Sequence, residues 1–249
     1  MIPIPPFPIH PPTRHLPTHS PTTHPPAYPP TRHPPMPHYL YLHGFASSPR
    51  SAKAQAMKTR FAALGIPLVI PDLNQGDFAH LTLSRQIQQI SALILSQPEP
   101  TVLIGSSLGG LTAAWVAQQV TITERIEKLV LLAPAFNFLQ QWLPRLGPEA
   151  LEAWRTTGTL SVYHYTEQRQ IPLHYRFITD AQGYRDEDLR ASIPTLILHG
   201  TRDETISIEA SRTYAAKRPW AKLIELPSDH ALTDVEPEIW QYTQAFLNL

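Results

Sequence analysis

The sequence contains no cysteine in 249 residues, and its 20 basic residues balance its 20 acidic ones. The absence of cysteine excludes disulfides, a thiolate metal site and a cysteine nucleophile. Balanced charge argues against a dedicated nucleic-acid binder, because such proteins carry a strongly basic surface. No run approaches the roughly 18 to 20 apolar residues that a membrane-spanning helix needs, so no membrane span is predicted. The length suits one α/β domain or two small ones.

Glycine and acidic residues are absent from the first 38 residues, which instead hold 15 of the 28 prolines and 6 of the 12 histidines. Proline removes backbone donors and disfavours helix at the preceding residue, so residues 1–37 are predicted to form a disordered Pro/His/Thr-rich extension. Two alternatives are a proline-rich docking segment and metal capture by the histidines. Met36 precedes the first strand-like segment by two residues, which makes it a candidate start of translation.

From residue 38 onward, short apolar runs alternate with helix-like stretches. The expected strands are His38–Leu42, Pro67–Ile70, Thr101–Ile104, Lys128–Ala133, Pro194–Leu198 and Ala221–Leu226. The expected helices between and after them are Ser51–Leu64, Thr82–Ser96, Ser107–Val120, Ile208–Lys217 and Pro237–Leu247. Continuous apolar strands separated by helices are typical of a parallel sheet covered on both faces. Residues 38–249 are therefore predicted to form a doubly wound, mostly parallel α/β domain of about six strands.

Almost sixty residues separate the fourth and fifth expected strands, which is too long for a plain crossover. An insertion is therefore predicted at about residues 136–192. It contains two helix-like stretches and two alternating stretches that suggest a hairpin, at Gln140–Leu146, Glu149–Arg155, Leu160–Tyr165 and Ile171–Ile178. Inserts at this point of an α/β enzyme commonly form a lid over the site, although its aromatic residues would also suit simple packing on the core.

The motif G-x-S-x-G occurs at residues 105–109, centred on Ser107. The apolar run TVLI precedes it and a helix-forming stretch follows, so it lies on the strand-to-helix turn that its chemistry requires. Gly105 and Gly109 allow the strand and the helix to approach each other closely around that turn. Ser107 is therefore the predicted nucleophile, whereas the glycine spacing is wrong for Ser106.

A serine nucleophile needs a base that is oriented by an acid, and in this architecture the chain order is serine, acid, histidine. Asp203 follows the fifth expected strand and His230 follows the sixth, so they are the predicted acid and base. Glu204 and Asp229 are the alternative acids, but Asp229 adjoins the histidine, which makes an aligned contact with its ring harder to form. His199 ends its strand ahead of the site and is interpreted as structural.

The oxyanion of an acyl-transfer intermediate needs two backbone donors. One is expected to be the N–H of Leu108, directly after the nucleophile. The other is expected from the loop after the first strand, where Gly44 permits a tight turn and Phe45 supplies the N–H. His43 is expected to shape this loop and not to act in catalysis.

The stretches YLYLHGFASSPRSAKAQAMK, IGSSLGG, LLAPA, HGTRDE and SDH resemble the YqiA/YcfP-type esterases of the α/β-hydrolase superfamily. The resemblance runs from about Pro37 to Leu249 and is most specific in HGF-x-SSPRSAKA. It implies an α/β-hydrolase fold and a small cytoplasmic serine hydrolase of acyl esters that uses neither cofactor nor metal. It also supports the site residues Ser107, Asp203, His230, Phe45 and Leu108. The sequence differs from the family in two places. It has the N-terminal extension, and it carries Ser228-Asp229 where members of the family have a glycine-asparagine pair.

These observations predict an esterase that acts on a small-molecule acyl ester through an acyl-enzyme. Thioesterase or another acyl-hydrolase activity is the alternative with the same triad. An alternative of another class is a noncatalytic interaction protein with a vestigial hydrolase fold and a proline-rich docking tail.

Overall fold

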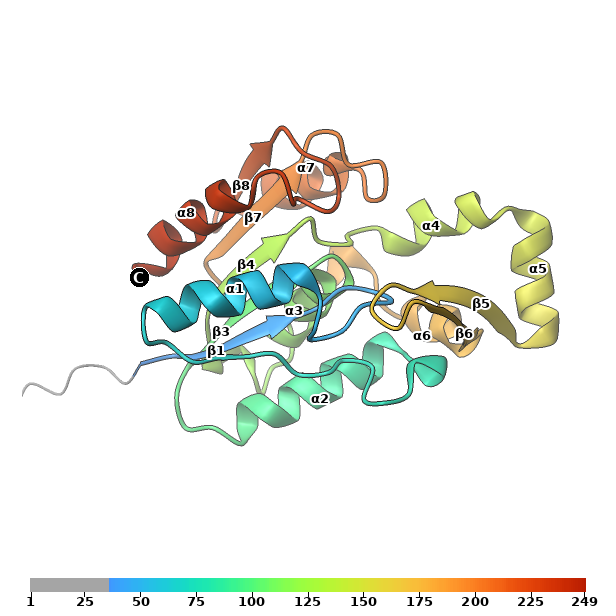
Figure 1. Ribbon diagram of the computed structural model, residues 1–249, viewed down its shortest axis with the longest axis horizontal. Coiled ribbons are helices and arrows are strands. Elements are labelled where there is room, and N and C mark those ends of the chain that lie inside the picture. The colour runs from blue at the N-terminus through green and yellow to red at the C-terminus, as the bar shows by residue number, and fades with distance from the viewer. Residues whose placement is uncertain (1–35) are drawn as a thin grey trace, which may run out of the picture. The chain divides into compact units, whose positions relative to one another are not determined.

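The computed structural model describes residues 36–249, so the predicted disordered extension lies outside the described residues except for its last two. Six strands form the central sheet: His38–Leu42 (β1), Leu68–Val69 (β2), Thr101–Ser106 (β3), Ile126–Leu132 (β4), Thr195–Gly200 (β7) and Ala221–Leu226 (β8). Their order across the sheet is β2-β1-β3-β4-β7-β8, and every neighbouring pair is parallel (Figure 1). The predicted parallel sheet of six strands is thereby confirmed.

Helices cover both faces of this sheet. They are Ala52–Ala63 (α1), Leu83–Leu95 (α2), Leu108–Ala117 (α3), Ile208–Ala216 (α7) and Glu236–Leu247 (α8). Tyr39 and Tyr41 of β1 pack with α1 and α8, whereas Leu40 and Leu42 of the same strand pack in the cluster of α2, α3 and α7. Because successive strand residues face opposite sides, these two clusters are the two sides of one doubly wound sheet.

The chain between β4 and β7, here called the insertion (residues 133–194), forms a helical arm and a hairpin beside the sheet (Figure 1). Its elements are Phe138–Leu146 (α4), Pro148–Thr157 (α5), Thr159–His164 (β5), Arg169–His174 (β6) and Arg176–Ala181 (α6). Three short 3₁₀ helices complete the described elements, at Phe78–His80 (η1), Thr123–Arg125 (η2) and Asp186–Asp188 (η3). The strands β5 and β6 are antiparallel, as a hairpin requires.

One boundary differs from the sequence-based expectation. The stretch Ile171–Ile178 is expected as a single strand, but β6 ends at His174 and α6 begins at Arg176. Alternation of apolar residues continues through Phe177, which hides the change of element. Helix α6 instead buries Phe177, Ile178 and Ala181, a spacing that suits one face of a helix. Within residues 36–249, the helices are all too short or too polar to cross a membrane.

Candidate active site

The predicted site residues follow the carboxyl ends of β1, β3, β7 and β8. Because all these strands are parallel, the loops after Leu42, Ser106, Gly200 and Leu226 emerge at the same edge of the sheet. Ligands in open α/β sheets bind outside the carboxyl ends of the strands. The parallel direction of the strands therefore brings four distant parts of the chain together in one site.

Ser107 lies on a sharp turn between β3 and α3, with φ 53° and ψ −119°. This backbone conformation is strained for a residue with a side chain, and the surroundings hold it in place. The N–H of Ser107 donates to the Leu132 carbonyl at 2.9 Å, and the Ser107 carbonyl accepts the N–H of Gly110 at 2.9 Å. A side chain at Gly109 would place Cβ 2.2 Å from the Leu42 carbonyl oxygen. Only glycine at this position lets the helix pack so closely on β1.

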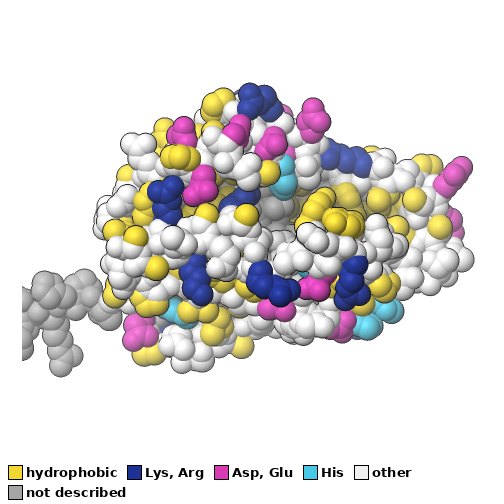
Figure 2. All heavy atoms as spheres, viewed as in Figure 1, with side chains coloured by type: hydrophobic (Ala, Val, Ile, Leu, Met, Phe, Trp, Pro, Cys, Tyr) yellow, Lys and Arg dark blue, Asp and Glu magenta, His cyan; other side chains and the backbone are white. Residues whose placement is uncertain are grey.

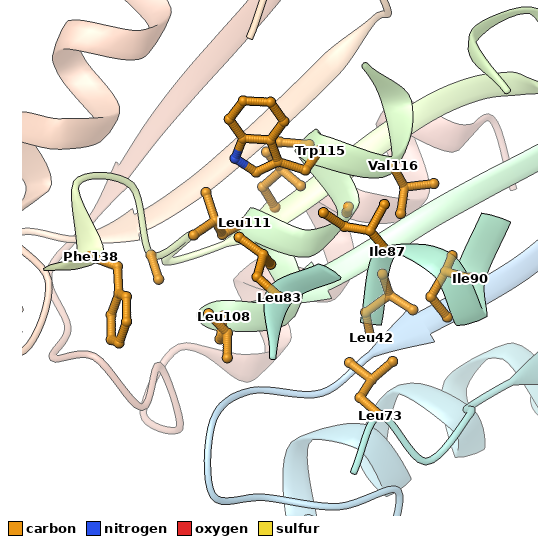
Figure 3. Packing of buried hydrophobic residues seen from close by; sticks show 14 of the residues in the cluster. Leu42, Leu73, Leu83, Ile87, Ile90, Leu108, Leu111, Trp115, Val116 and Phe138 are labelled. Carbon is orange, nitrogen blue, oxygen red and sulfur yellow. The ribbon is translucent and has the colours of Figure 1, made fainter. Parts of the chain in front are cut away.

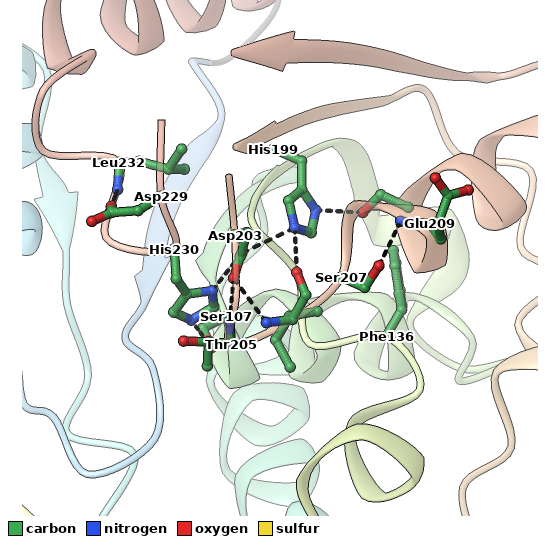
Figure 4. A network of polar contacts seen from close by, with 12 residues as sticks. Ser107, Phe136, His199, Asp203, Thr205, Ser207, Glu209, Asp229, His230 and Leu232 are labelled. Atoms are coloured by element: carbon green, nitrogen blue, oxygen red, sulfur yellow. Dashed lines mark hydrogen bonds and ion pairs between the residues drawn. The ribbon is translucent and has the colours of Figure 1, made fainter. Parts of the chain in front are cut away.

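The structure brings the side chains of Ser107, His230 and Asp203 together in a continuous row (Figure 4). The Nε2 atom of His230 lies 2.9 Å from the Ser107 Oγ, and its Nδ1 lies 2.7 Å from Asp203 Oδ2. The Asp203 side chain is fully buried, whereas that of His230 is 25% exposed. Since a carboxylate can only accept, the Nδ1 of His230 carries the proton and its Nε2 is free to accept one from the serine.

Asp203 is fixed by more than His230. Its Oδ1 accepts the N–H groups of Thr205 and Ile206, both at 2.8 Å, and its Oδ2 lies 3.1 Å from His199 Nε2. Burial by itself would raise the pKa of Asp203, but the hydrogen bonds from His199 and His230 outweigh it and hold that pKa well below its usual range. The carboxylate is therefore ionised throughout the neutral range.

The position of His199 corrects one sequence-based expectation. The prediction that this residue ends its strand too early to reach the site is wrong, because its ring contacts the Asp203 carboxylate directly. Its Nδ1 lies 2.8 Å from the Ser211 hydroxyl of α7. His199 thus acts on the position of Asp203 from inside the protein.

The two alternative acids occupy other positions. Asp229 points away from the His230 ring (Figure 4), and its Oδ1 accepts the N–H groups of Ala231 at 2.9 Å and Leu232 at 3.3 Å. Glu204 is exposed and lines the cavity in front of the site. The geometry favours Asp203 as the partner of His230.

The β1–α1 loop (residues 43–51) packs directly against Ser107. A Cβ at Gly44 would lie 3.3 Å from the Ser107 Cβ and 4.0 Å from its Oγ, which leaves no room for a larger residue without a shift. Within residues 36–249, the backbone N–H groups of Phe45 and Leu108 donate to no protein acceptor. His43 shapes the loop from beneath: its Nδ1 donates to the Gly44 carbonyl, and its Nε2 accepts the N–H of Leu73, each at 3.0 Å.

A cavity of about 910 Å³ opens in front of Ser107 and His230. It lies between the strand ends and the insertion, and its walls are mainly apolar and aromatic. Lining residues from the insertion include Phe138, Trp142, Arg145, Leu146, Leu160, Val162, Tyr163 and Tyr165. Figure 2 shows a hollow on this face, with hydrophobic side chains gathered on the side of the hairpin.

A second apolar cavity of about 360 Å³ lies beside the first. The two share Leu108 and Phe138 as lining residues, and Leu83 and Leu111 line only the smaller one. Figure 3 shows Leu108 and Leu111 of α3 beside Leu83 of α2, with Phe138 at the edge of this group.

Lys53 is a residue near the site to which the sequence assigns no role. Its Nζ donates to the Oγ of Ser106, the neighbour of Ser107, at 3.2 Å. Burial lowers the pKa of Lys53 to about 8, against the opposing attraction of Asp203 and Asp229. In the sequence, Lys53 is marked only by its place in the stretch SSPRSAKA. That stretch does not indicate a contact with the serine turn until the fold is known.

No group of three or more histidine, aspartate or glutamate side chains suited to a metal ion occurs among the described residues. The candidate site itself brings together the hydroxyl of Ser107, the imidazole of His230 and the carboxylate of Asp203, beside the backbone N–H groups of Phe45 and Leu108. Such an arrangement can activate a serine and hold a developing negative charge on an oxygen.

A family model described as "Uncharacterised protein family (UPF0227)" matches residues 38–247. Among solved structures, a protein described as "Putative hydrolase from Agrobacterium vitis S4" superposes with a TM-score of 0.74 at 22% identity, covering 85% of this chain and 88% of that one. Mouse alpha/beta hydrolase domain-containing protein 10 gives 0.72 at 20% identity, with 85% and 90% covered. A monoacylglycerol lipase from Paleococcus ferrophilus gives 0.68 at 18% identity, with 84% and 93% covered. These likenesses show an α/β-hydrolase fold.

Proposed function

The chain belongs to the uncharacterised protein family UPF0227, and we propose that it is a serine hydrolase that cleaves carboxylic esters through an acyl-enzyme on Ser107. The observation that carries this proposal is the row of contacts from Ser107 Oγ to His230 Nε2, at 2.9 Å, and from His230 Nδ1 to Asp203, at 2.7 Å. A buried, ionised carboxylate at the end of that row orients the imidazole and stabilises its protonated form.

In the proposed mechanism, His230 Nε2 takes the Ser107 proton while Oγ attacks the ester carbonyl carbon. The N–H groups of Phe45 and Leu108 stabilise the negative charge that develops on the carbonyl oxygen. When the intermediate collapses, His230 returns the proton to the leaving alcohol and the acyl group stays on Ser107. Water then attacks the acyl-enzyme with the same histidine as base, which releases the acid and restores the serine.

The cavity in front of Ser107 supports a small-molecule acyl ester as substrate. Its volume of about 910 Å³ falls in the range of ligand sites. The wall that the insertion contributes consists largely of aromatic and aliphatic side chains. We expect an apolar acyl or aromatic group to occupy that side. A panel of p-nitrophenyl esters and acyl thioesters of graded length separates ester from thioester hydrolysis.

The proposal is tested with an alkyl fluorophosphonate, which reacts with activated serines. We expect one adduct on Ser107 of the folded protein, found by mass spectrometry of the digested chain. Ser107→Ala should abolish labelling and lower turnover by at least roughly 10³-fold, as loss of a triad member does. Ser106→Ala is the matched control, since it removes a hydroxyl one residue away, and it should be labelled like the wild type. A folded wild-type protein that gives no adduct and hydrolyses no ester in the panel contradicts the proposal.

A further inference from the structure

The motif HGF-x-SSPR contains residues that the proposed chemistry leaves without a role. In the structure, the β1–α1 loop that carries them is in contact with the turn of the β5–β6 hairpin, more than a hundred residues further along the chain. We propose that this turn (residues 164–168) positions the β1–α1 loop so that the Phe45 N–H is held ready for the oxyanion. This inference rests on the proposed function of the site.

The first contact is a backbone hydrogen bond. The N–H of Tyr165 donates to the carbonyl of Ala46 at 2.9 Å. Ala46 directly follows Phe45, is buried, and has φ 50°, a left-handed conformation that is uncommon for alanine. Such a conformation persists only when its surroundings hold it, and the hairpin amide is one of the groups that do so.

The second contact is buried and passes through Asn74. The side-chain amide of Asn74 donates to the Ser47 carbonyl at 2.7 Å, and the same nitrogen lies 3.3 Å from the His164 Nε2. His164 Nδ1 accepts the N–H of Glu167 at 3.2 Å, so Nε2 of the neutral ring carries the proton and its contact with Asn74 is one of packing rather than a hydrogen bond. Asn74 and His164 are 7% and 2% exposed. The end of β5 thus packs against the side chain that holds the residue after Ala46.

Aromatic packing fixes the two elements in the same place. The His164 ring meets the Phe78 ring edge-on at 5.0 Å, and Phe78 in turn packs at 5.5 Å from Phe45. An exposed ion pair between Arg50 and Glu167, at 3.0 Å, lies outside this group. Exposed ion pairs contribute little to stability. Removal of this pair therefore serves as a control for removal of the buried contacts.

These contacts make the hairpin turn a positioning element for Phe45. On one side, the His43 ring accepts the N–H of Leu73. On the other side, the Tyr165 N–H and the Asn74 amide donate to the carbonyls of Ala46 and Ser47. A loop fixed from two sides presents its free N–H in one direction. Preorganised donors of this kind act on the transition state, so the turn should affect kcat far more than KM.

The test compares two substitutions at one position. Tyr165→Pro removes the backbone N–H, whereas Tyr165→Ala removes the same exposed side chain and keeps the N–H. We expect kcat of Tyr165→Pro to fall roughly 10- to 100-fold below that of Tyr165→Ala, with KM within about threefold, because a displaced oxyanion donor retains part of its effect. Glu167→Ala, which removes only the exposed ion pair, should stay within about twofold of wild type.

Inhibitor binding separates positioning from a general structural effect. A trifluoromethyl ketone forms a tetrahedral oxyanion adduct with the serine, whereas a non-reactive ether analogue of the substrate does not. Affinity for the ketone should fall in parallel with kcat in Tyr165→Pro, while affinity for the ether is retained. If Tyr165→Pro does not fold, His164→Ala serves as the second variant, with the same expected split.

Equal kcat values for folded Tyr165→Pro and Tyr165→Ala overturn the inference, as does an unchanged kcat and ketone affinity in His164→Ala. Failure of the proposed function looks different, because the wild type itself would then neither hydrolyse esters nor react with a fluorophosphonate.

Discussion

The carboxyl of Asp186 joins the two ends of the insertion. Its Oδ2 accepts the N–H of Asn137, the residue before α4, at 2.6 Å. Burial raises the pKa of Asp186 to about 6, although the Asn137 N–H and Arg218 oppose the shift. The folded protein therefore retains the Asp186 proton at pH values where the unfolded chain, with a pKa near 4, has lost it.

This shift gives stability a pH dependence with a definite sign. Because the folded-state pKa is raised, the contribution is fully present below about pH 4 and is lost as pH rises through about 6. Asp186→Asn keeps an acceptor for the Asn137 N–H and has no charge to bury. We expect its free energy of unfolding to exceed that of wild type by about 1–3 kcal/mol at pH 7, with the difference shrinking towards pH 4.

Denaturant titrations at several pH values measure that difference. Asp188→Asn is the control in the same 3₁₀ helix, since Asp188 forms an exposed pair with Arg185 at 2.9 Å. It should show no such pH-dependent gain. A difference between Asp186→Asn and wild type that stays constant from pH 4 to 7 contradicts the assignment.

Single residues differ in how readily the sequence reveals them. Ser107, Asp203 and His230 each follow an apolar strand, so their meeting at one edge of the sheet can be predicted from local patterns. Asn74 and His164 are 90 positions apart and no local pattern links them. Contacts of this kind arise only when the insertion folds back on the β1–α1 loop, so the sequence alone does not indicate them.

Among the elements, α4 begins with Phe138, one of the two residues that line both cavities. Its ring packs on Trp142 at 5.2 Å and on Phe177 at 5.6 Å. Phe138→Ala should join the larger cavity to the smaller one. We expect its preference among p-nitrophenyl esters, from acetate to dodecanoate, to move towards longer acyl chains.

The relevant measurement is kcat/KM across the ester series. Leu139→Ala is the control because Leu139 lines only the smaller cavity, and its profile should peak at the same chain length as wild type. Truncation of a buried phenylalanine commonly costs about 3–5 kcal/mol, so both variants are compared at a temperature where they are folded. If Phe138→Ala and wild type show the same chain-length profile, the Phe138 side chain between the two cavities does not set the acyl-chain specificity.

Elements with strong periodicity are the ones that the sequence locates well. Strand β8 occupies the expected residues, α2 is shorter than expected by one residue at each end, and α8 begins one residue earlier than expected. The hairpin is located less well, because Ile171, Leu173, Tyr175 and Phe177 continue the alternation beyond the end of β6. There the burial of α6 against the core outweighs the local pattern.

At the scale of the whole molecule, the described residues 38–249 supply the six strands of the sheet and all the residues of the candidate site. Among the described residues, the members of both hydrophobic clusters and every residue placed in the proposed mechanism lie between 38 and 249. We therefore expect a chain lacking residues 1–35 to match the full chain in melting temperature and in kcat/KM. Loss of activity in the shortened chain would show that the extension contributes to the site.

The fold class and the family follow from the sequence because both depend on features repeated along the chain. Strands that alternate with helices predict the parallel sheet, and HGF-x-SSPRSAKA with IGSSLGG indicates the family. A cytoplasmic location stays a prediction from the resemblance. Substrate identity is not encoded in such patterns, because the cavity walls come from α4, β5 and several loops, among them those after β1, β7 and β8, and their mutual placement depends on the complete fold.

The backbone of Ser107 has a consequence for engineering. A φ of 53° is unfavourable for serine and readily adopted by glycine, so Ser107→Gly would relieve about 1 kcal/mol or more of strain. The same change removes the hydroxyl that lies 2.9 Å from His230 Nε2. Under the proposed mechanism, selection of variants for heat resistance alone would thus favour inactive proteins at this position. A thermostability screen of this family therefore needs an activity criterion applied in the same round.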